Sequence, residues 1–145
     1  MSTLHAAYRY GDTRLFARLV CLLVGGDSAH VEMAEPLGDG LWRCTSSSWM
    51  DGGPRQKVMP LPPEKWRVYK TDVHLSHANE WLIANMASGY GWVKLLRFVF
   101  PWFRPSFGGP ICTECWAQVL GIGDADSWNL RASEAVTAWR YKRFQ

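Results

Sequence analysis

The chain has 145 residues, of which 48% are hydrophobic and 20% charged, and its formal net charge is +3. This length and composition predict one globular domain, residues 1–145, and exclude a disordered chain. The charge is too small and too scattered to indicate nucleic-acid binding, and no run of 18 apolar residues predicts a membrane span. Four cysteines are too few for a disulfide framework in a chain of this size, so we expect a reducing compartment.

The N-terminal segment predicts one strand and one helix. A short strand is expected over residues 4–10. Apolar residues then recur at helical spacing and predict a buried helix over 13–24, capped by Asp12 or Thr13 and ended by the glycine pair that follows. This apolar stretch contains Arg18 and lacks a small-residue cleavage site, so it does not resemble a signal peptide.

Residues 30–34 predict a strand with two different faces. Alternation places Val31 and Met33 on one side, with His30 and Glu32 on the other. A loop over 35–40 and three further strands are predicted to follow, the strands over 41–49, 56–61 and 66–70.

The second half of the chain predicts helices. They are expected over 72–86, over 92–98, from Cys112 to the stop at Gly121, and over 133–142, the last introduced by Asn129. A turn-rich loop is expected over 101–110. This order of elements predicts an α+β fold in which a small antiparallel sheet packs against helices.

Cys112 is the first candidate for chemistry, because it opens a helix directly after Gly108-Gly109-Pro110. The unpaired N–H groups and the dipole at a helix N-terminus stabilise a thiolate and thereby favour a sulfur nucleophile. This stretch taken alone fits an ordinary buried thiol equally well.

His30 and Glu32 favour the interpretation of Cys112 as a nucleophile over that of an ordinary buried thiol. They share one face of a predicted strand, and papain-like chemistry needs a thiolate, an imidazole that moves the proton, and a polar group that orients the imidazole. We expect the Cys112 sulfur to lie within about 4 Å of a His30 ring nitrogen.

The residues around this trio resemble a known family. Ser28-Ala-His30-Val-Glu32 is similar to the Ser-His-Val-Glu signature of circularly permuted papain-like hydrolases, which are relatives of the NlpC-type cell-wall peptidases and have the histidine before the cysteine. The resemblance continues in Ser46-Ser-Ser-Trp-Met-Asp-Gly-Gly53, Trp66, Gly89-Tyr-Gly-Trp92, Ile111-Cys-Thr-Glu-Cys115 and Asn129-Leu-Arg-Ala-Ser133. The chain departs from the family pattern at Ala29, which separates the serine from the histidine, and in lacking the C-terminal proline.

The resemblance implies a permuted papain-like fold and a cysteine hydrolase that needs no cofactor and no metal. Cys112 would be the nucleophile and His30 the general base, with Glu32 as third catalytic residue and Ser47 as the alternative. The favoured substrate is a peptidoglycan peptide amide, with lipid amides or esters still open. The Cys112 N–H would supply one oxyanion contact.

Two other hypotheses remain open at this stage. On the same fold, the chain could be a non-catalytic component of a phage tail or another cell-wall-penetrating assembly, with its nine tryptophans serving interfaces. Alternatively, Cys112 and Cys115 with His74 and His77 could form a Cys₂His₂ zinc site. Under both hydrolase and assembly hypotheses we expect a phage- or prophage-encoded protein that is made in the cytoplasm and then acts in a virion or on the cell wall.

Overall fold

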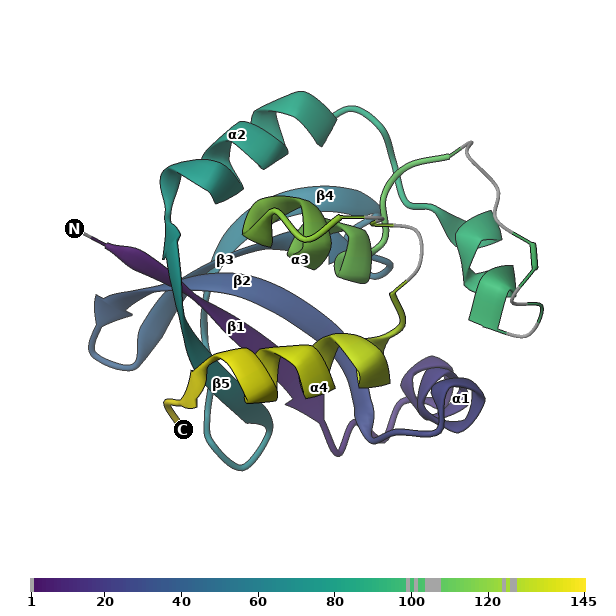
Figure 1. The fold of residues 1–145 in the computed structure, drawn as a ribbon, viewed down its shortest axis with the longest axis horizontal. Helices are drawn as coiled ribbons and strands as arrows, with labels where there is room; N and C mark the ends of the chain where they lie inside the picture. The colour runs from purple at the N-terminus through teal and green to yellow at the C-terminus, as the bar shows by residue number, and fades with distance from the viewer. Residues whose placement is uncertain (1, 99, 101, 104–107, 124, 126–127) are drawn as a thin grey trace.

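A six-stranded antiparallel sheet, in the order β4-β3-β2-β1-β5-β6, forms the centre of an α+β fold (Figure 1). The computed structural model describes residues 2–98, 100, 102–103, 108–123, 125 and 128–145. The strands are β1 (Thr3–Tyr10), β2 (Ser28–Gly38), β3 (Leu41–Ser48), β4 (Gly53–Pro60), β5 (Trp66–His74) and β6 (Lys142–Arg143). The helices are α1 (Leu15–Val24), α2 (Ser76–Asn85), α3 (Cys112–Leu120) and α4 (Leu130–Arg140), with a 3₁₀ segment, η1 (Trp92–Phe98).

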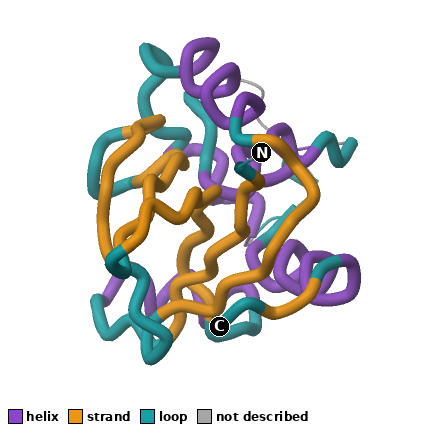
Figure 2. The backbone as a smooth tube through the Cα atoms, turned by 90° about the vertical axis from the view of Figure 1, so that its left-hand side faces the viewer, coloured by secondary structure: helices purple, strands orange, loops and turns teal. Residues whose placement is uncertain are grey.

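Helices α2, α3 and α4 cover one face of this sheet (Figure 1). Figure 2 shows the twisted strands in orange and most of the helical turns to one side of them. Val31 and Met33 of β2 lie in the core beneath the helices together with the fully buried Trp116 of α3. The predicted division of β2 into two faces is therefore confirmed for its apolar side.

Hydrogen bonds inside this core fix α3 against α4 and β1. The Trp116 indole N–H donates to Thr137 Oγ1 over 3.0 Å, and the Tyr8 hydroxyl lies 3.0 Å from the same oxygen. Because all three side chains are buried, these bonds satisfy polar groups that would otherwise be costly in the core.

Several predicted boundaries were wrong. The loop expected over 35–40 is mostly strand, because β2 continues to Gly38 and meets β3 through a two-residue turn. Asp39 and Gly40 both have positive φ, 53° and 74°, as this type of hairpin turn requires. The helix predicted over 72–86 begins only at Ser76, because pairing with β1 extends β5 to His74.

Helix α1 was predicted to be buried, but only Ala17 and Val20 are. Its leucines lie on the surface, with Leu15 84% exposed. The predicted N-caps were also wrong, since the helix begins after Arg14, whose N–H donates to Asp12 Oδ1. The predicted stop is confirmed, as Gly25 is left-handed with φ 69°. Asn129 likewise caps α4, accepting a hydrogen bond from the Ala132 N–H over 2.8 Å. The helix expected over 133–142 thus starts earlier, at Leu130.

Three glycine-containing turns meet next to the start of α3. A Cβ placed on Gly109 would lie 1.8 Å from the Gly89 carbonyl oxygen, and one on Gly91 would lie 2.2 Å from the Gly109 carbonyl oxygen. A Cβ on Gly53 would lie 2.6 Å from the Gly89 carbonyl carbon. The backbones thus touch where no side chain fits, and this contact fixes the chain just before Cys112. The larger part of the loop predicted over 101–110 lies outside the described residues.

No helix in the described ranges is both long and apolar enough to cross a membrane.

We predict that Gly109→Ala lowers the free energy of unfolding by about 2–3 kcal/mol, because the new methyl group collides with backbone that cannot rotate away. Gly123→Ala is the matched control, since a Cβ there meets no atom within 4 Å, and its effect should stay within about 0.5 kcal/mol. Urea denaturation of both variants measures the difference. Equal stabilities would contradict the close contact of the three turns.

Candidate functional site

Cys112 is the first residue of α3, as predicted. The preceding Ile111 is extended, with φ −103° and ψ 171°, and the helix ends at left-handed Gly121. The Ser47 hydroxyl of β3 donates a hydrogen bond to the Pro110 carbonyl and so ties the beginning of α3 to the sheet. Cys112 is 6% exposed, and its N–H lies in the first helical turn, where backbone donors have no partner within the helix.

His30 lies near the beginning of β2 and contacts the two other predicted site residues. Its Nε2 is 2.8 Å from Glu32 Oε1, and the Cys112 side chain is among the neighbours that raise the pKa of the ring. Burial alone would lower the pKa of His30, but the charge of Glu32 and the hydrogen bonds to Cys112 and Glu32 outweigh it and raise that pKa to about 9.

Glu32 has no exposed side-chain surface (0%). Burial by itself would raise its pKa, but the charge of His30, together with hydrogen bonds from Arg55 and His30, lowers it to about 2. Glu32 is therefore a carboxylate at neutral pH, when His30 carries a proton. A buried anion of this kind holds the imidazole in one orientation and stabilises its charged form.

Arg55 of β4 is the site residue that sequence reasoning missed. Its Nη1 donates to Glu32 Oε2 over 2.7 Å, and its Nη2 donates to Oε1. Strand register explains the contact, because Glu32 and Arg55 occupy one row across the sheet with Ser46 between them. The small Ser46 side chain turns to the Val31 carbonyl, 2.7 Å away, and leaves the guanidinium room to cross β3.

Arg55 is itself held by Asp51 of the turn between β3 and β4. Its Nε donates to Asp51 Oδ2 over 2.8 Å, and Lys57 Nζ bonds the same oxygen over 3.1 Å. A continuous series of hydrogen bonds therefore runs from His30 through Glu32 and Arg55 to the turn. A hydrogen-bonded series of this kind restricts each member to one geometry.

The beginning of β2 is anchored two residues before His30. Ser28 Oγ donates to Glu134 Oε1 of α4 over 2.6 Å, and Arg67 of β5 bonds both Glu134 oxygens over 2.7 Å. Arg67 also bonds Asp27. These contacts join α4, β5 and β2 at the point where the histidine must be held.

The structure thus places His30 against Glu32, and the Cys112 side chain is near enough to affect the pKa of His30. Ser47, the alternative third residue, donates its hydrogen bond to the Pro110 carbonyl. The four residues of the zinc hypothesis do not converge, because the described residues contain no group of three or more histidine, cysteine or acidic side chains arranged to hold a metal. Instead, Cys115 donates to the Thr45 carbonyl over 3.9 Å, and His74 Nδ1 lies 3.1 Å from Ser76 Oγ.

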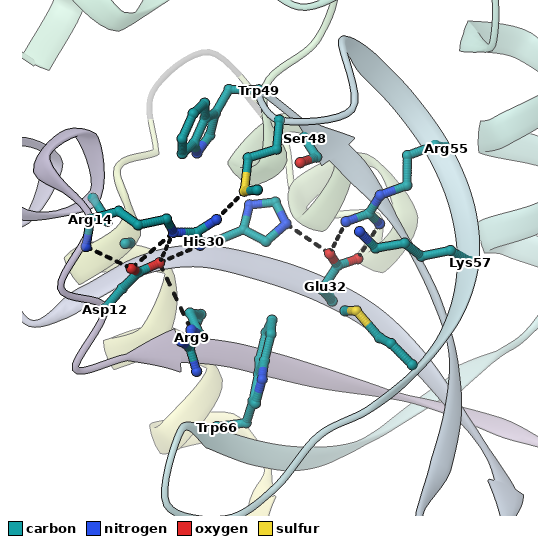
Figure 3. Close-up of a pocket in the computed structure, with 14 residues that line it drawn as sticks. Arg9, Asp12, Arg14, His30, Glu32, Ser48, Trp49, Arg55, Lys57 and Trp66 are labelled. Carbon is teal, nitrogen blue, oxygen red and sulfur yellow. Dashed lines mark hydrogen bonds and ion pairs between the residues drawn. The ribbon is translucent and has the colours of Figure 1, made fainter.

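A cavity of about 190 Å³ opens beside this series of contacts (Figure 3). His30 and Glu32 form part of its wall, whereas Cys112 does not line it. The other side chains named in the figure come from three regions of the chain. Arg9 lies on β1, with Asp12 and Arg14 just before α1. Ser48 ends β3 and Trp49 follows it, while Arg55 and Lys57 lie on β4 and Trp66 begins β5. The cavity is small beside the roughly 300–1,000 Å³ of pockets that enclose a whole drug-sized ligand, so it suits one side chain of a larger substrate.

Comparisons with known proteins identify no family. No protein-family model matches the sequence, and a search of curated proteins finds no match.

We predict that the His30 ring titrates near pH 9, above its ordinary value of 6.5, and that Glu32→Gln lowers this pKa because it removes the adjacent negative charge. NMR titration of the ring protons measures both values. The control is Asp51→Asn, since Asp51 bonds Arg55 and Lys57, and it should leave the His30 titration nearly unchanged.

The pH dependence of the free energy of unfolding follows from the directions of these two pKa shifts. The raised pKa of His30 stabilises the fold fully below pH 6.5, and this contribution is lost as pH rises through about 9. The lowered pKa of Glu32 stabilises it above pH 4.5, and this contribution is lost as pH falls towards 2. A pKa of 6.5 for His30 in the wild-type protein would contradict the burial of its ring beside an ionised Glu32.

Proposed function

We propose that this protein is a cysteine hydrolase that cleaves amide bonds through Cys112. The observation that carries the proposal is the environment of His30, whose Nε2 lies 2.8 Å from the buried Glu32 carboxylate and whose pKa is raised, against the effect of burial, by Glu32 and Cys112. Nucleophile, proton carrier and orienting carboxylate are the three parts that thiol-dependent acyl transfer requires.

The proposed reaction begins from an ion pair in which His30 already carries a proton and Cys112 is the thiolate. The sulfur attacks the amide carbonyl carbon, and the Cys112 N–H stabilises the oxyanion of the tetrahedral intermediate. His30 then gives its proton to the departing amine, and the C–N bond breaks to leave a thioester. A water molecule, deprotonated by His30, attacks the thioester and releases the carboxylic acid and the thiol.

Chain order and local sequence favour the circularly permuted, NlpC-type relatives of papain as the family. His30 precedes Cys112, an antiparallel sheet carries the histidine, and a helix N-terminus carries the cysteine. Two of the runs on which the resemblance rests meet in space at Gly53 and Gly89, and Gly109, two residues before the run that contains Cys112, also lies against Gly89. This family acts on peptidoglycan peptides, which are therefore the favoured substrates.

A second candidate function is a structural part of a phage tail or another cell-wall-penetrating assembly. Large apolar side chains at the surface favour it, among them Leu15 and Trp102, which are 84% and 79% exposed. Size-exclusion chromatography followed by zymography on cell walls separates the two functions. A monomer that clears cell walls contradicts a purely structural role.

We predict that Cys112→Ser lowers amide hydrolysis at least about 10³-fold, because the hydroxyl cannot replace the thiolate, while the melting temperature stays nearly unchanged. His30→Ala should cost comparable activity, since nucleophile and base act as a unit. Cys21→Ser, on α1, is the matched control and should retain activity. Zymography and release of new amino groups from cell walls measure the loss, and an active Cys112→Ser variant would contradict the proposal.

We also predict that iodoacetamide at about pH 6 labels Cys112 much faster than the other three thiols. Burial raises the pKa of Cys21, Cys44 and Cys115, so these remain protonated and slow to react. Mass spectrometry of the labelled peptides gives the four rates. Four equally slow labelling rates would contradict the assignment of Cys112 as the nucleophile.

A further inference from the structure

Cys115 of α3 is a buried thiol for which the proposed reaction has no use. It is 0% exposed, and its Sγ donates to the Thr45 carbonyl over 3.9 Å, a long contact for a weak donor. All four cysteines of the chain are free thiols. In a reducing compartment, a Cys-x-x-Cys pair is typical of redox or metal chemistry rather than of a structural disulfide. The pair formed by Cys112 and Cys115 is therefore a candidate for chemistry of its own.

Helix geometry places the two thiols side by side. Cys112 and Cys115 are the first and fourth residues of α3, and residues three apart lie on the same face of a helix. The rise and radius of an α-helix put their Cα atoms about 5 Å apart, within the roughly 4.4–6.8 Å that disulfides span. Burial is the main cause that raises the pKa of Cys115, followed by the charges of Glu32 and Cys112. The two thiols are therefore near enough to interact.

The beginning of α3 can make the small adjustment that a bond between these thiols requires. Cβ atoms three residues apart on a helix are about 5–6 Å apart, whereas a disulfide brings them to about 3.5–4.5 Å. Cys112 is the first helical residue, and its N–H has no partner within the helix. A shift of Cys112 therefore leaves intact the bond of 3.2 Å from the Cys115 N–H to the Ile111 carbonyl.

We propose that Cys112 and Cys115 form a reversible disulfide when a hydroperoxide oxidises Cys112. This inference rests on the proposed function, because it takes Cys112 as the reactive thiolate. The Cys112 sulfur attacks the terminal oxygen of the hydroperoxide, the O–O bond breaks, and the leaving oxygen takes the proton of His30. The products are a sulfenic acid on Cys112 and water or an alcohol.

Cys115 resolves this sulfenic acid in the second step. Its thiol loses a proton, its sulfur attacks the Cys112 sulfur, and the S–O bond breaks as the departing hydroxide takes up that proton as water. In sum, the two thiols lose two electrons and two protons to the hydroperoxide. The disulfide blocks hydrolysis, but a dithiol restores both thiols by exchange, whereas sulfinic and sulfonic acids on Cys112 are not restored in this way.

The test is the mass and the thiol count of the full chain after treatment with hydrogen peroxide, with no substrate present. We expect the wild type to lose two hydrogen atoms and to fall from four alkylatable thiols to two under denaturing conditions. Dithiothreitol should reverse both changes, and peptide mapping should place the bond between Cys112 and Cys115. Cys115→Ser, whose hydroxyl can still donate to the Thr45 carbonyl, should instead gain oxygen atoms on Cys112 that dithiothreitol does not remove.

The matched control is Cys44→Ser, because Cys44 is an equally buried thiol that also bonds a backbone carbonyl, that of Trp42 over 3.8 Å. It should form the same disulfide as the wild type. Oxygen on Cys112 while Cys115 stays free, a bond to Cys21 or Cys44, or oxidation that dithiothreitol reverses equally in Cys115→Ser would each overturn the pairing.

The wild-type bond is mapped without any variant, so an unfolded Cys115→Ser protein would leave the test intact. These readouts need no hydrolysis, and they are therefore separate from a failure of the cysteine hydrolase proposal, which the Cys112 variants test in an activity assay.

Discussion

The buried carboxylate of Glu32 is the constraint on which the site depends. Removing a carboxylate from water costs several kcal/mol, and only well-placed partners compensate for it. Glu32 obtains them from His30 on its own strand and from Arg55 two strands away. The arrangement therefore requires β2, β3 and β4 to pair in one register, so that the orientation of the proposed catalytic imidazole is set by the pairing of the sheet itself.

The features that could be predicted from the sequence are those with local causes. Glycine at the end of α3 and asparagine before α4 act within one helical turn, and the alternation of β2 separates His30 and Glu32 from Val31 within five residues. The α+β class follows from the order of such elements. The pairing of Cys112 with His30 was predicted from chemistry and family resemblance, because no local pattern links residues so far apart.

Arg55 could not be found in this way, because its role depends on how β3 and β4 pair. One available signal was the small residue at Ser46, which lies between Arg55 and Glu32 in the observed register. The two-residue turn at Asp39 and Gly40 was a stronger missed signal, since an Asp-Gly pair between apolar runs is typical of a tight hairpin. Recognising this turn would have extended the predicted strand from His30 to Gly38 and paired it with the strand that begins at Leu41.

The place of β4 at the border of the sheet has a consequence for how a peptide can be held. A bordering strand offers free backbone groups to which an extended peptide can add as a further strand. Here Pro54 and Pro60 lack N–H donors at the two ends of β4, while Arg55 and Lys57 place charge between them. These features oppose strand addition and protect the protein from sheet-to-sheet aggregation. They therefore disfavour any peptide that would bind by adding a strand along β4.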